Sequence, residues 1–137
     1  MRAKDLMRTE VLTVSADDTV ETLIETFVGE HIHGAPVLDG AGKLVGMVTQ
    51  QDIFFSAMTR NPTPGDAAVS PSSVRVGSIM TSPAVSANED TEILALCEMM
   101  HRLRIHRVPI VEEGKLAGIV SSLDICRAVA DGSIKGE

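Results

Sequence analysis

With 137 residues, the chain has room for one globular unit or for two very small ones that share a core. Its net charge of −7 argues against nonspecific nucleic-acid binding, which depends on neutralising phosphates with Lys and Arg. No apolar run approaches membrane-spanning length, and the start MRAKDLMRTE lacks the apolar run of a signal peptide. We therefore expect a cytoplasmic protein with neither nucleic acid nor membrane as a partner. Its core should be built from Val, Ile, Leu, Met and Ala, because Trp and Tyr are absent.

Each half of the chain opens with the same two short segments. Residues 3–8 (AKDLMR) match residues 76–81 (VGSIMT) as short turns. Brief β-candidates follow at 11–14 and at 83–86, and each leads into a polar stretch with acids where a first helical turn would begin. The order of elements is therefore predicted to occur twice.

A helix is predicted over residues 20–30, where apolar residues recur at helical spacing. Its apolar stripe consists of Val20, Leu23, Ile24, Phe27 and Val28. The matching helix, from about 91 to 103, is apolar over most of its circumference, and so is the segment 53–58. Helices of that kind are buried on more than one side. The surplus apolar surface favours a homodimer, although contact with the other half of the chain would also use it.

Each half continues with a β-hairpin. Strands at 34–39 and 107–112 lead through short Gly turns into second strands. These second strands carry a repeated seven-residue motif, GMVTQQD at 46–52 and GIVSSLD at 118–124. Each repeat therefore reads β-α-β-β-α.

The two motifs place a hydroxyl and a carboxylate three residues apart at a strand-to-helix corner. The pairs are Thr49 with Asp52 and Ser121 with Asp124. A helix cap alone explains such a pair, since the hydroxyl can cap the helix and the acid suits the positive end of its dipole. Recurrence within a larger repeat favours a ligand site as well.

With these motifs in register, the sequence resembles a tandem pair of CBS (cystathionine-β-synthase-like) domains, a Bateman module. The resemblance covers roughly 3–58 and 76–131. It implies an α+β fold of two β-α-β-β-α CBS repeats packed about a pseudo-twofold axis, with two clefts between the repeats. The expected organisation is a first CBS domain at 1–58, a linker at 59–75, a second CBS domain at 76–131 and a tail at 132–137.

By resemblance, the chain is a regulatory module that binds an adenosine-containing ligand such as AMP, ADP or ATP and signals by changing the shape of its dimer. The nucleotide is then a regulatory ligand, and no cofactor is required. We expect no enzyme activity, because the chain has no Gly-rich phosphate loop and neither Cys has a base partner. The alternatives are a structural or interaction protein without nucleotide affinity and an S-adenosylmethionine binder. The sequence leaves a further protein target unidentified.

The resemblance also implies roles for individual residues. The two acids would accept hydrogen bonds from the ribose diol, with the paired hydroxyls donating to ribose or phosphate. An ionised carboxylate suits that role, since each such charged bond is worth about 1.5–3 kcal/mol. The expected nucleotide-binding residues are Met47, Thr49, Gln51, Asp52 and His33 from the first repeat and His106, Arg107, Ile119, Ser121 and Asp124 from the second.

The two sites should be unequal. In the family, phosphate contacts from one repeat tend to serve the acid of the other, so Asp52 would draw on His106 and Arg107, and Asp124 on His33. Before Asp124 stands Leu123, which cannot hydrogen-bond a ligand, whereas Gln51 still can. We therefore expect the tighter site at Asp52.

Residues 101–107 (HRLRIHR) form a cationic island in this acidic chain. Either they are a solvated helix end, where cations suit the dipole, or they lie beside the ligand. His31 and His33 form an H-x-H pair without a third ligand at an obvious spacing, so we predict no metal site. Cys97 and Cys126 fit no metal or redox spacing and are expected to be buried, reduced thiols.

Overall fold

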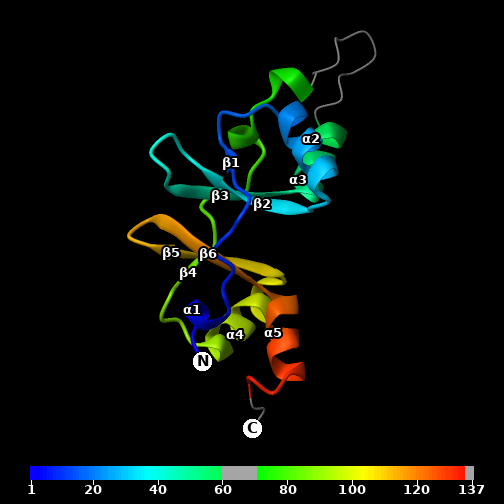
Figure 1. Cartoon of the computed structure of the whole chain (residues 1–137). Helices are drawn as coiled ribbons and strands as arrows, with labels where there is room; N and C mark the ends of the chain where they lie inside the picture. Colours follow the sequence, from blue (N-terminus) through cyan, green and yellow to red (C-terminus); the bar gives the residue numbers. More distant parts are fainter. Residues whose placement is uncertain (60–70, 135–137) are drawn as a thin grey trace. The chain divides into compact units, whose positions relative to one another are not determined.

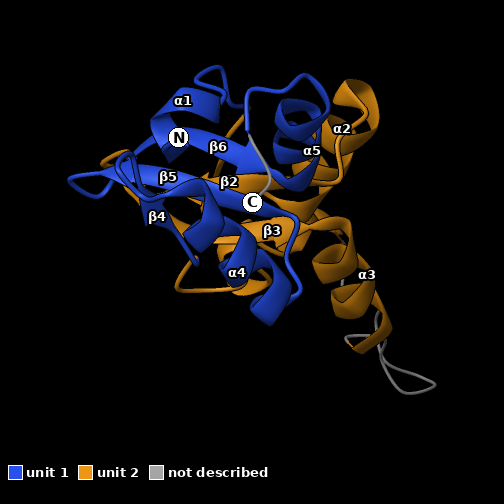
Figure 2. Ribbon diagram, turned by 90° about the horizontal axis from the view of Figure 1, so that it is seen from below, with its two compact units in different colours: residues 1–11, 85–137 blue, residues 12–84 orange. Residues whose placement is uncertain are grey.

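The computed structural model describes residues 1–59 and 71–134. The chain divides into two compact units, which Figure 2 colours separately. Unit 1 comprises Met1–Val11 and Val85–Glu137, and unit 2 comprises Leu12–Ala84. Within the described ranges, no helix is both long enough and apolar enough to cross a membrane.

Unit 2 contains one three-stranded sheet in the order β1-β2-β3. Strand β1 runs parallel to β2, and β2 forms an antiparallel hairpin with β3. Figure 1 shows α2 and α3 on one side of this sheet. The elements of unit 2 are β1 (Val14–Ser15), α2 (Val20–Glu30), β2 (Gly34–Leu38), β3 (Leu44–Thr49), α3 (Gln50–Thr59) and the 3₁₀ turns η1 (Pro71–Ser73) and η2 (Val76–Ser78).

Unit 1 repeats this plan with a sheet in the order β4-β5-β6. Strand β4 is parallel to β5, and β5 is antiparallel to β6. The predicted α+β class and the β-α-β-β-α repeat are confirmed. The elements of unit 1 are α1 (Ala3–Leu6), β4 (Ala87–Asn88), α4 (Ile93–Leu103), β5 (Arg107–Glu112), β6 (Lys115–Ser121) and α5 (Ser122–Ala130).

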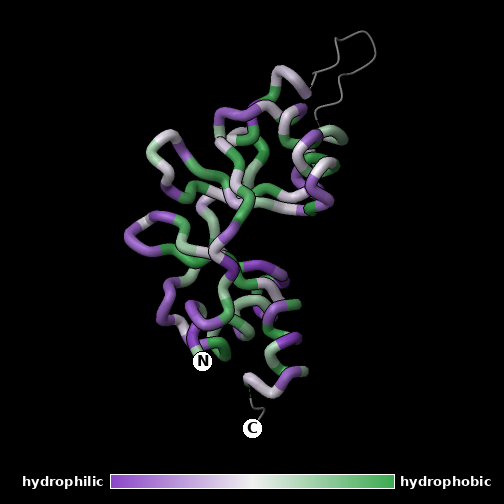
Figure 3. The backbone as a smooth tube through the Cα atoms, viewed as in Figure 1, coloured by the Kyte–Doolittle hydropathy of each residue, from purple (hydrophilic) through white to green (hydrophobic). Residues whose placement is uncertain are grey.

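The two hairpins have the same register and the same buried positions. Pro36 lies opposite Met47, and Pro109 lies opposite Ile119. Each of these four strands has one fully buried valine: Val37 and Val48 in unit 2, and Val108 and Val120 in unit 1. In Figure 3 the strands are mostly hydrophobic, whereas the turn of the β5–β6 hairpin is hydrophilic. Each unit therefore has its own small apolar core between one sheet and its helices, and Phe27 is the aromatic member of the core in unit 2.

Several local predictions were wrong. The first strand of each repeat is only two residues long and starts later than expected, at Val14 and Ala87. Val28, assigned to the core stripe of α2, is 69% exposed, because α2 buries only the narrower face of Val20, Leu23 and Phe27. In the matching helix, Leu94 also faces out and is 67% exposed.

The leading segments of the two repeats are exchanged between the units. Residues 1–11 belong to unit 1, with the second repeat, and residues 76–84 belong to unit 2, with the first. Arg8 forms two backbone hydrogen bonds with Ile119 on β6, of 2.9 and 3.0 Å. Thr81 bridges Met47 on β3 in the same way, with bonds of 3.0 and 2.8 Å. The compact units therefore do not coincide with the repeats read along the sequence.

The expected linker overlaps the described part of the chain only at its ends. Residues 60–70 of it lie outside the described residues. Its last part belongs to unit 2, because η1 packs beside α2 and Val74 is buried in that unit.

Glycines at the centre of β3 and β6 permit the leading segments to lie so close. A Cβ added at Gly118 would stand 2.7 Å from the carbonyl oxygen of Arg8 and 2.9 Å from the sulfur of Met7. A Cβ at Gly46 would stand 2.8 Å from the carbonyl oxygen of Thr81 and 2.7 Å from the sulfur of Met80. Both contacts include backbone, which cannot move aside as a flexible side chain can.

We predict that Gly118→Ala lowers the free energy of unfolding by about 1–3 kcal/mol, because the added methyl group forces the backbone of Arg8 away from β6. Gly29→Ala is the matched control, since nothing lies within 4 Å of its added Cβ. Because Gly29 lies in the last turn of α2, that change should stabilise the chain by at most about 0.5–1 kcal/mol. Urea unfolding of both variants measures the difference, and equal stabilities would contradict the close packing at Gly118.

Candidate functional site

The first strand-to-helix corner joins β3 to α3 in unit 2. The backbone N–H of Thr49 donates to Oδ2 of Asp52 at 2.8 Å, and the Thr49 hydroxyl donates to the same oxygen at 3.2 Å. The N–H of Asp52 donates back to Thr49 Oγ1 at 3.3 Å. This is the reciprocal cap that the sequence allowed. Within residues 1–59 and 71–134, the other carboxylate oxygen, Oδ1, accepts no hydrogen bond and no ion pair.

The second corner, between β6 and α5 in unit 1, is built differently at one atom. The N–H of Ser121 donates to Oδ2 of Asp124 at 2.9 Å, and the N–H of Asp124 donates to Ser121 Oγ at 3.1 Å. Oδ1 of Asp124 is held by Arg8, whose Nε lies 3.1 Å away and whose Nη2 lies 3.0 Å away. Both oxygens of this carboxylate are therefore engaged.

Asp124 is only 9% exposed and is the one buried polar residue in the described part of the chain. Burial raises the pKa of its carboxyl, but the hydrogen bonds from Ser121 and the positive charge of Arg8 outweigh that effect. The pKa of Asp124 consequently lies below its ordinary value of 3.8. The ionised carboxylate is thus the stable form at this corner.

A histidine precedes the strand beside each corner. The carbonyl of His33 accepts from the N–H of Gln50 at 2.9 Å, and that of His106 accepts from Ser122 at 2.8 Å. The ring Nδ1 of His33 also lies 3.1 Å from Oε1 of Gln50. The backbone of His33 is therefore bonded to the start of α3, and that of His106 to the start of α5.

Arg107 also belongs to the Ser121 corner by strand pairing. It is the direct cross-strand partner of Ser121, so the two side chains lie on the same face of the sheet. The expected site residues therefore gather into one set in each unit. The assignment of cations from one repeat to the acid of the other stays a prediction.

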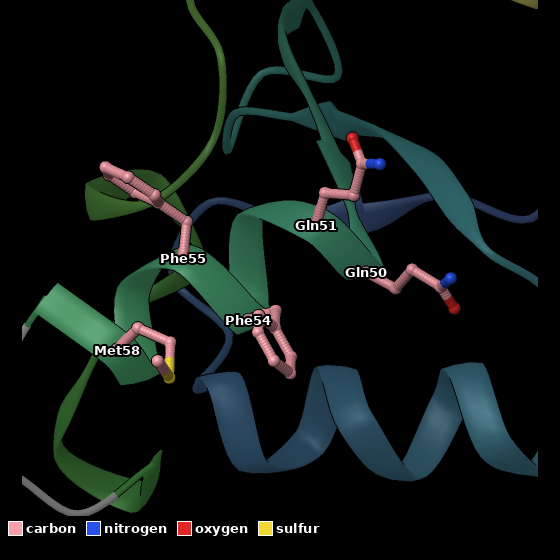
Figure 4. Close-up of a pocket in the computed structure, with 5 residues that line it drawn as sticks. All are labelled: Gln50, Gln51, Phe54, Phe55 and Met58. Carbon is pink, nitrogen blue, oxygen red and sulfur yellow. The ribbon is translucent and has the colours of Figure 1, made fainter.

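Met47 and Ile119, expected to line the base, are half-buried at the bridges to the leading segments. Gln51 is exposed and lines an open cavity of about 690 Å³ along α3. Figure 4 shows this cavity with its other lining residues. They are Gln50, Phe54, Phe55 and Met58.

The cationic island lines a second cavity, of about 800 Å³, in unit 1. This cavity lies at the end of α4 and the start of α5 and brings together His101, Arg102, Arg104 and His106. All four side chains are exposed, so they are solvated and able to meet an anion. Cys126 also lines the cavity and is exposed, which corrects the expectation that both thiols are buried.

Comparison with known proteins identifies the family. The model of the CBS domain matches residues 3–61 and again residues 76–131. The chain belongs to the CBS domain family. The CBS domain-containing protein YhcV of Bacillus subtilis (strain 168) is 30% identical over 122 residues, which cover 89% of this chain and 81% of that protein. The expected tandem pair of CBS domains is confirmed.

Two further relatives bear on function. Inosine-5'-monophosphate dehydrogenase of Methanocaldococcus jannaschii is 34% identical over 127 residues; the match covers 92% of this chain and spans only 23% of that enzyme. The CBS domain pair of protein MJ0100 has been solved in complex with 5'-methylthioadenosine and S-adenosyl-L-methionine. It is 25% identical, has a TM-score of 0.78, and the alignment covers 96% of this chain and 98% of that one.

Arg8, which lies at the second CBS corner, was not among the site residues predicted from the sequence. The repeat held the signal, because Arg8 matches Thr81 in the paired leading segments. A cation stands there in one repeat and a neutral hydroxyl residue in the other. The exchange of segments, which brings Arg8 to the acid of the second repeat, could not be predicted from the sequence.

We predict that Asp124→Asn makes stability less sensitive to acid. Because the pKa of Asp124 is depressed in the folded chain, its ionised form contributes stability that is fully present above the unfolded-state pKa. That contribution is lost as pH falls through the folded pKa, so wild type should lose more stability than the variant as the pH is lowered from 5 to below 3.8.

Urea unfolding at several pH values measures this difference. Asp17→Asn, a change at an exposed carboxylate of unit 2, is the control and should follow the wild-type curve. Parallel curves for wild type and Asp124→Asn would contradict the stabilised carboxylate.

Proposed function

We propose that this CBS pair is a regulatory module that senses an adenosine-containing ligand, such as AMP, ADP or ATP, in the clefts that the family pattern implies. The observation that carries the proposal is the open Oδ1 of Asp52 beside the Thr49 hydroxyl. A carboxylate with one oxygen fixed by its own helix cap is already oriented, so its second oxygen can accept from a ribose hydroxyl without further ordering. The adenosine ligands of the MJ0100 CBS pair support the same ligand class.

The remaining site residues suit the other parts of such a ligand. The half-buried side chains of Met47 and Ile119 offer apolar surface to a base. His33, His106 and Arg107 offer hydrogen-bond donors and charge to phosphates. We propose that no residue of the chain performs catalysis, and that ligand binding changes the shape of a dimer. A cytoplasmic location stays a prediction of the sequence.

A second candidate is an S-adenosylmethionine binder, which the ligand of MJ0100 favours. The two candidates differ in charge, since S-adenosylmethionine carries a cationic sulfonium where a nucleotide carries phosphate. The positive charges of Arg107 and of Arg102 and Arg104 in the cavity at the end of α4 favour the nucleotide.

We predict that Asp52→Ala weakens the tightest AMP binding about tenfold or more, because one charged hydrogen bond to the ribose is lost. Isothermal calorimetry with AMP measures the change. Glu25→Ala is the matched control, an exposed acid on α2 of the same unit that should bind as wild type does.

The same titrations separate the candidates. Adenosine should bind at least a few-fold more weakly than AMP, and the gap should shrink with added salt, because the phosphate contacts are charge-assisted. Equal affinity for adenosine and AMP at every ionic strength would remove His106 and Arg107 from the site. A strong preference for S-adenosylmethionine would favour the second candidate, and absence of binding by all three would leave a structural or interaction role.

The homodimer is proposed from apolar surface on the two helices that the sequence singled out. α3 buries none of its residues, and Phe54, Phe55 and Met58 on it are 69%, 70% and 62% exposed. All three line the same cavity, with Phe54 and Met58 projecting from one side of α3 and Phe55 from another (Figure 4). Soluble monomers rarely leave large apolar surface of this kind uncovered. On α4, Met99 is half-buried and Leu94 is exposed.

We predict by light scattering a mass of about twice the 14.6 kDa of one chain at tens of micromolar. Phe55→Glu or Met99→Glu should shift the protein toward monomer, depending on which helix forms the contact. Val28→Glu is the control, because Val28 is equally exposed but lies on α2. A wild-type mass of one chain would refute the dimer.

A further inference from the structure

The two CBS corners differ in the state of a single carboxylate oxygen. In both, the helix cap takes Oδ2 of the aspartate. At Asp52 the remaining oxygen is open within the described ranges, whereas at Asp124 it already accepts a hydrogen bond from Nε of Arg8 and forms an ion pair with Nη2 of the same guanidinium. The oxygen that would accept from a ribose is therefore occupied in the second repeat.

The position of Arg8 is fixed by the backbone rather than by the ion pair. Two hydrogen bonds join Arg8 to Ile119, and the missing side chain of Gly118 lets its carbonyl lie against β6. Thr81 is held to Met47 by the equivalent pair of bonds in unit 2. The scaffold is thus the same in both units, and only the side chain at this position differs. Threonine is neutral and too short to mimic the guanidinium.

The two side chains of the ion pair differ in solvent exposure. The Asp124 side chain is 9% exposed, but that of Arg8 is 58% exposed. Arg8 uses Nε and Nη2 for Asp124, so further N–H donors of the guanidinium remain for another acceptor. Phosphate is such an acceptor, because its geometry matches the guanidinium fork as well as a carboxylate does.

We propose that Arg8 is a specificity-determining residue that closes the Asp124 corner to uncharged nucleosides. A ribose gains access to Oδ1 only when an anionic group on the same ligand draws the guanidinium away from Asp124. Adenosine has no such group and must break the ion pair without replacing it. When a nucleotide binds, the guanidinium of Arg8 leaves the carboxylate of Asp124 and pairs with the phosphate instead. This inference rests on the proposed function, and it assigns the selectivity of the second corner to a residue outside the repeated motif.

The test exchanges the two matched residues. Arg8→Thr gives the second corner the side chain of the first, and Thr81→Arg gives the first corner the side chain of the second. Binding of adenosine and of AMP is measured by calorimetry. Arg8→Thr is placed in an Asp52→Ala background, so that the measured binding comes from the Asp124 corner. Thr81→Arg is placed in an Asp124→Ala background for the same reason.

In the Asp52→Ala background, Arg8→Thr should raise the affinity for adenosine about tenfold and reduce the preference for AMP over adenosine. In the Asp124→Ala background, Thr81→Arg should lower the affinity for adenosine by a similar factor, while AMP binding falls less. Lys4→Gln is the control, since Lys4 forms the other ion pair of the same leading segment, with Asp90. It should leave both affinities unchanged.

Unchanged or weaker adenosine binding in Arg8→Thr would overturn the inference and make the ion pair purely structural. If that variant does not fold, Thr81→Arg decides alone, because Thr81 is exposed and has room for a longer side chain; unchanged adenosine binding there overturns the inference too. These outcomes leave the proposed function intact as long as the wild-type protein binds AMP. A wild-type protein that binds neither compound would refute the proposed function and this inference together.

Discussion

The fold depends on the contact between backbone and backbone at Gly46 and Gly118. At each glycine a leading segment lies so close to the central part of a strand that a methyl group would not fit. The contact puts Arg8 and Thr81 beside the strands that end at the two corners. A larger residue at either glycine would therefore disturb both the packing of the unit and the surroundings of its aspartate.

The aspartate that caps each helix can also take the ligand-binding role proposed for it, because its two oxygens are separable. In both units, one oxygen accepts from the N–H of the hydroxyl residue three positions earlier. That bond fixes the rotation of the carboxylate, and the second oxygen then points in a defined direction. The capping and the ligand-binding interpretations of the T/S-x-x-D pair are thus compatible. The hydrogen bond that caps the helix also orients the oxygen proposed to accept from the ligand.

The parts of the fold that follow from local patterns could be predicted from the sequence. The helix at Val20–Glu30 starts and ends where its apolar spacing indicates, and the hairpins start and end on the predicted runs. The corners at Thr49 and Ser121 were also placed correctly, because a strand, a hydroxyl residue and an acid follow one another directly in the chain. Each of these features depends on neighbours within a few residues.

The parts that depend on distant neighbours could not be predicted. Val28 has the spacing of a core residue but is exposed, because α2 buries only the narrower face of Val20, Leu23 and Phe27. The two-residue strands β1 and β4 are defined by their parallel partners rather than by their own sequence. Arg8 is separated from Asp124 by almost the whole chain, so no local pattern joins them. The part of the site that distinguishes the two repeats is therefore the part that sequence patterns did not reveal.

The exchange of leading segments also gives the chain an order of assembly. Unit 2 is continuous, from Leu12 to Ala84, whereas unit 1 is made from the two ends of the chain with all of unit 2 inserted between them. Joining Val11 to Val85 closes a long loop, and the entropy lost in that closure is smaller once the intervening chain is already compact. Unit 2 can form during synthesis, while Met1–Val11 must wait for β6 to be made. Met1–Val11 are thus synthesised before unit 2 but reach their native contacts after it.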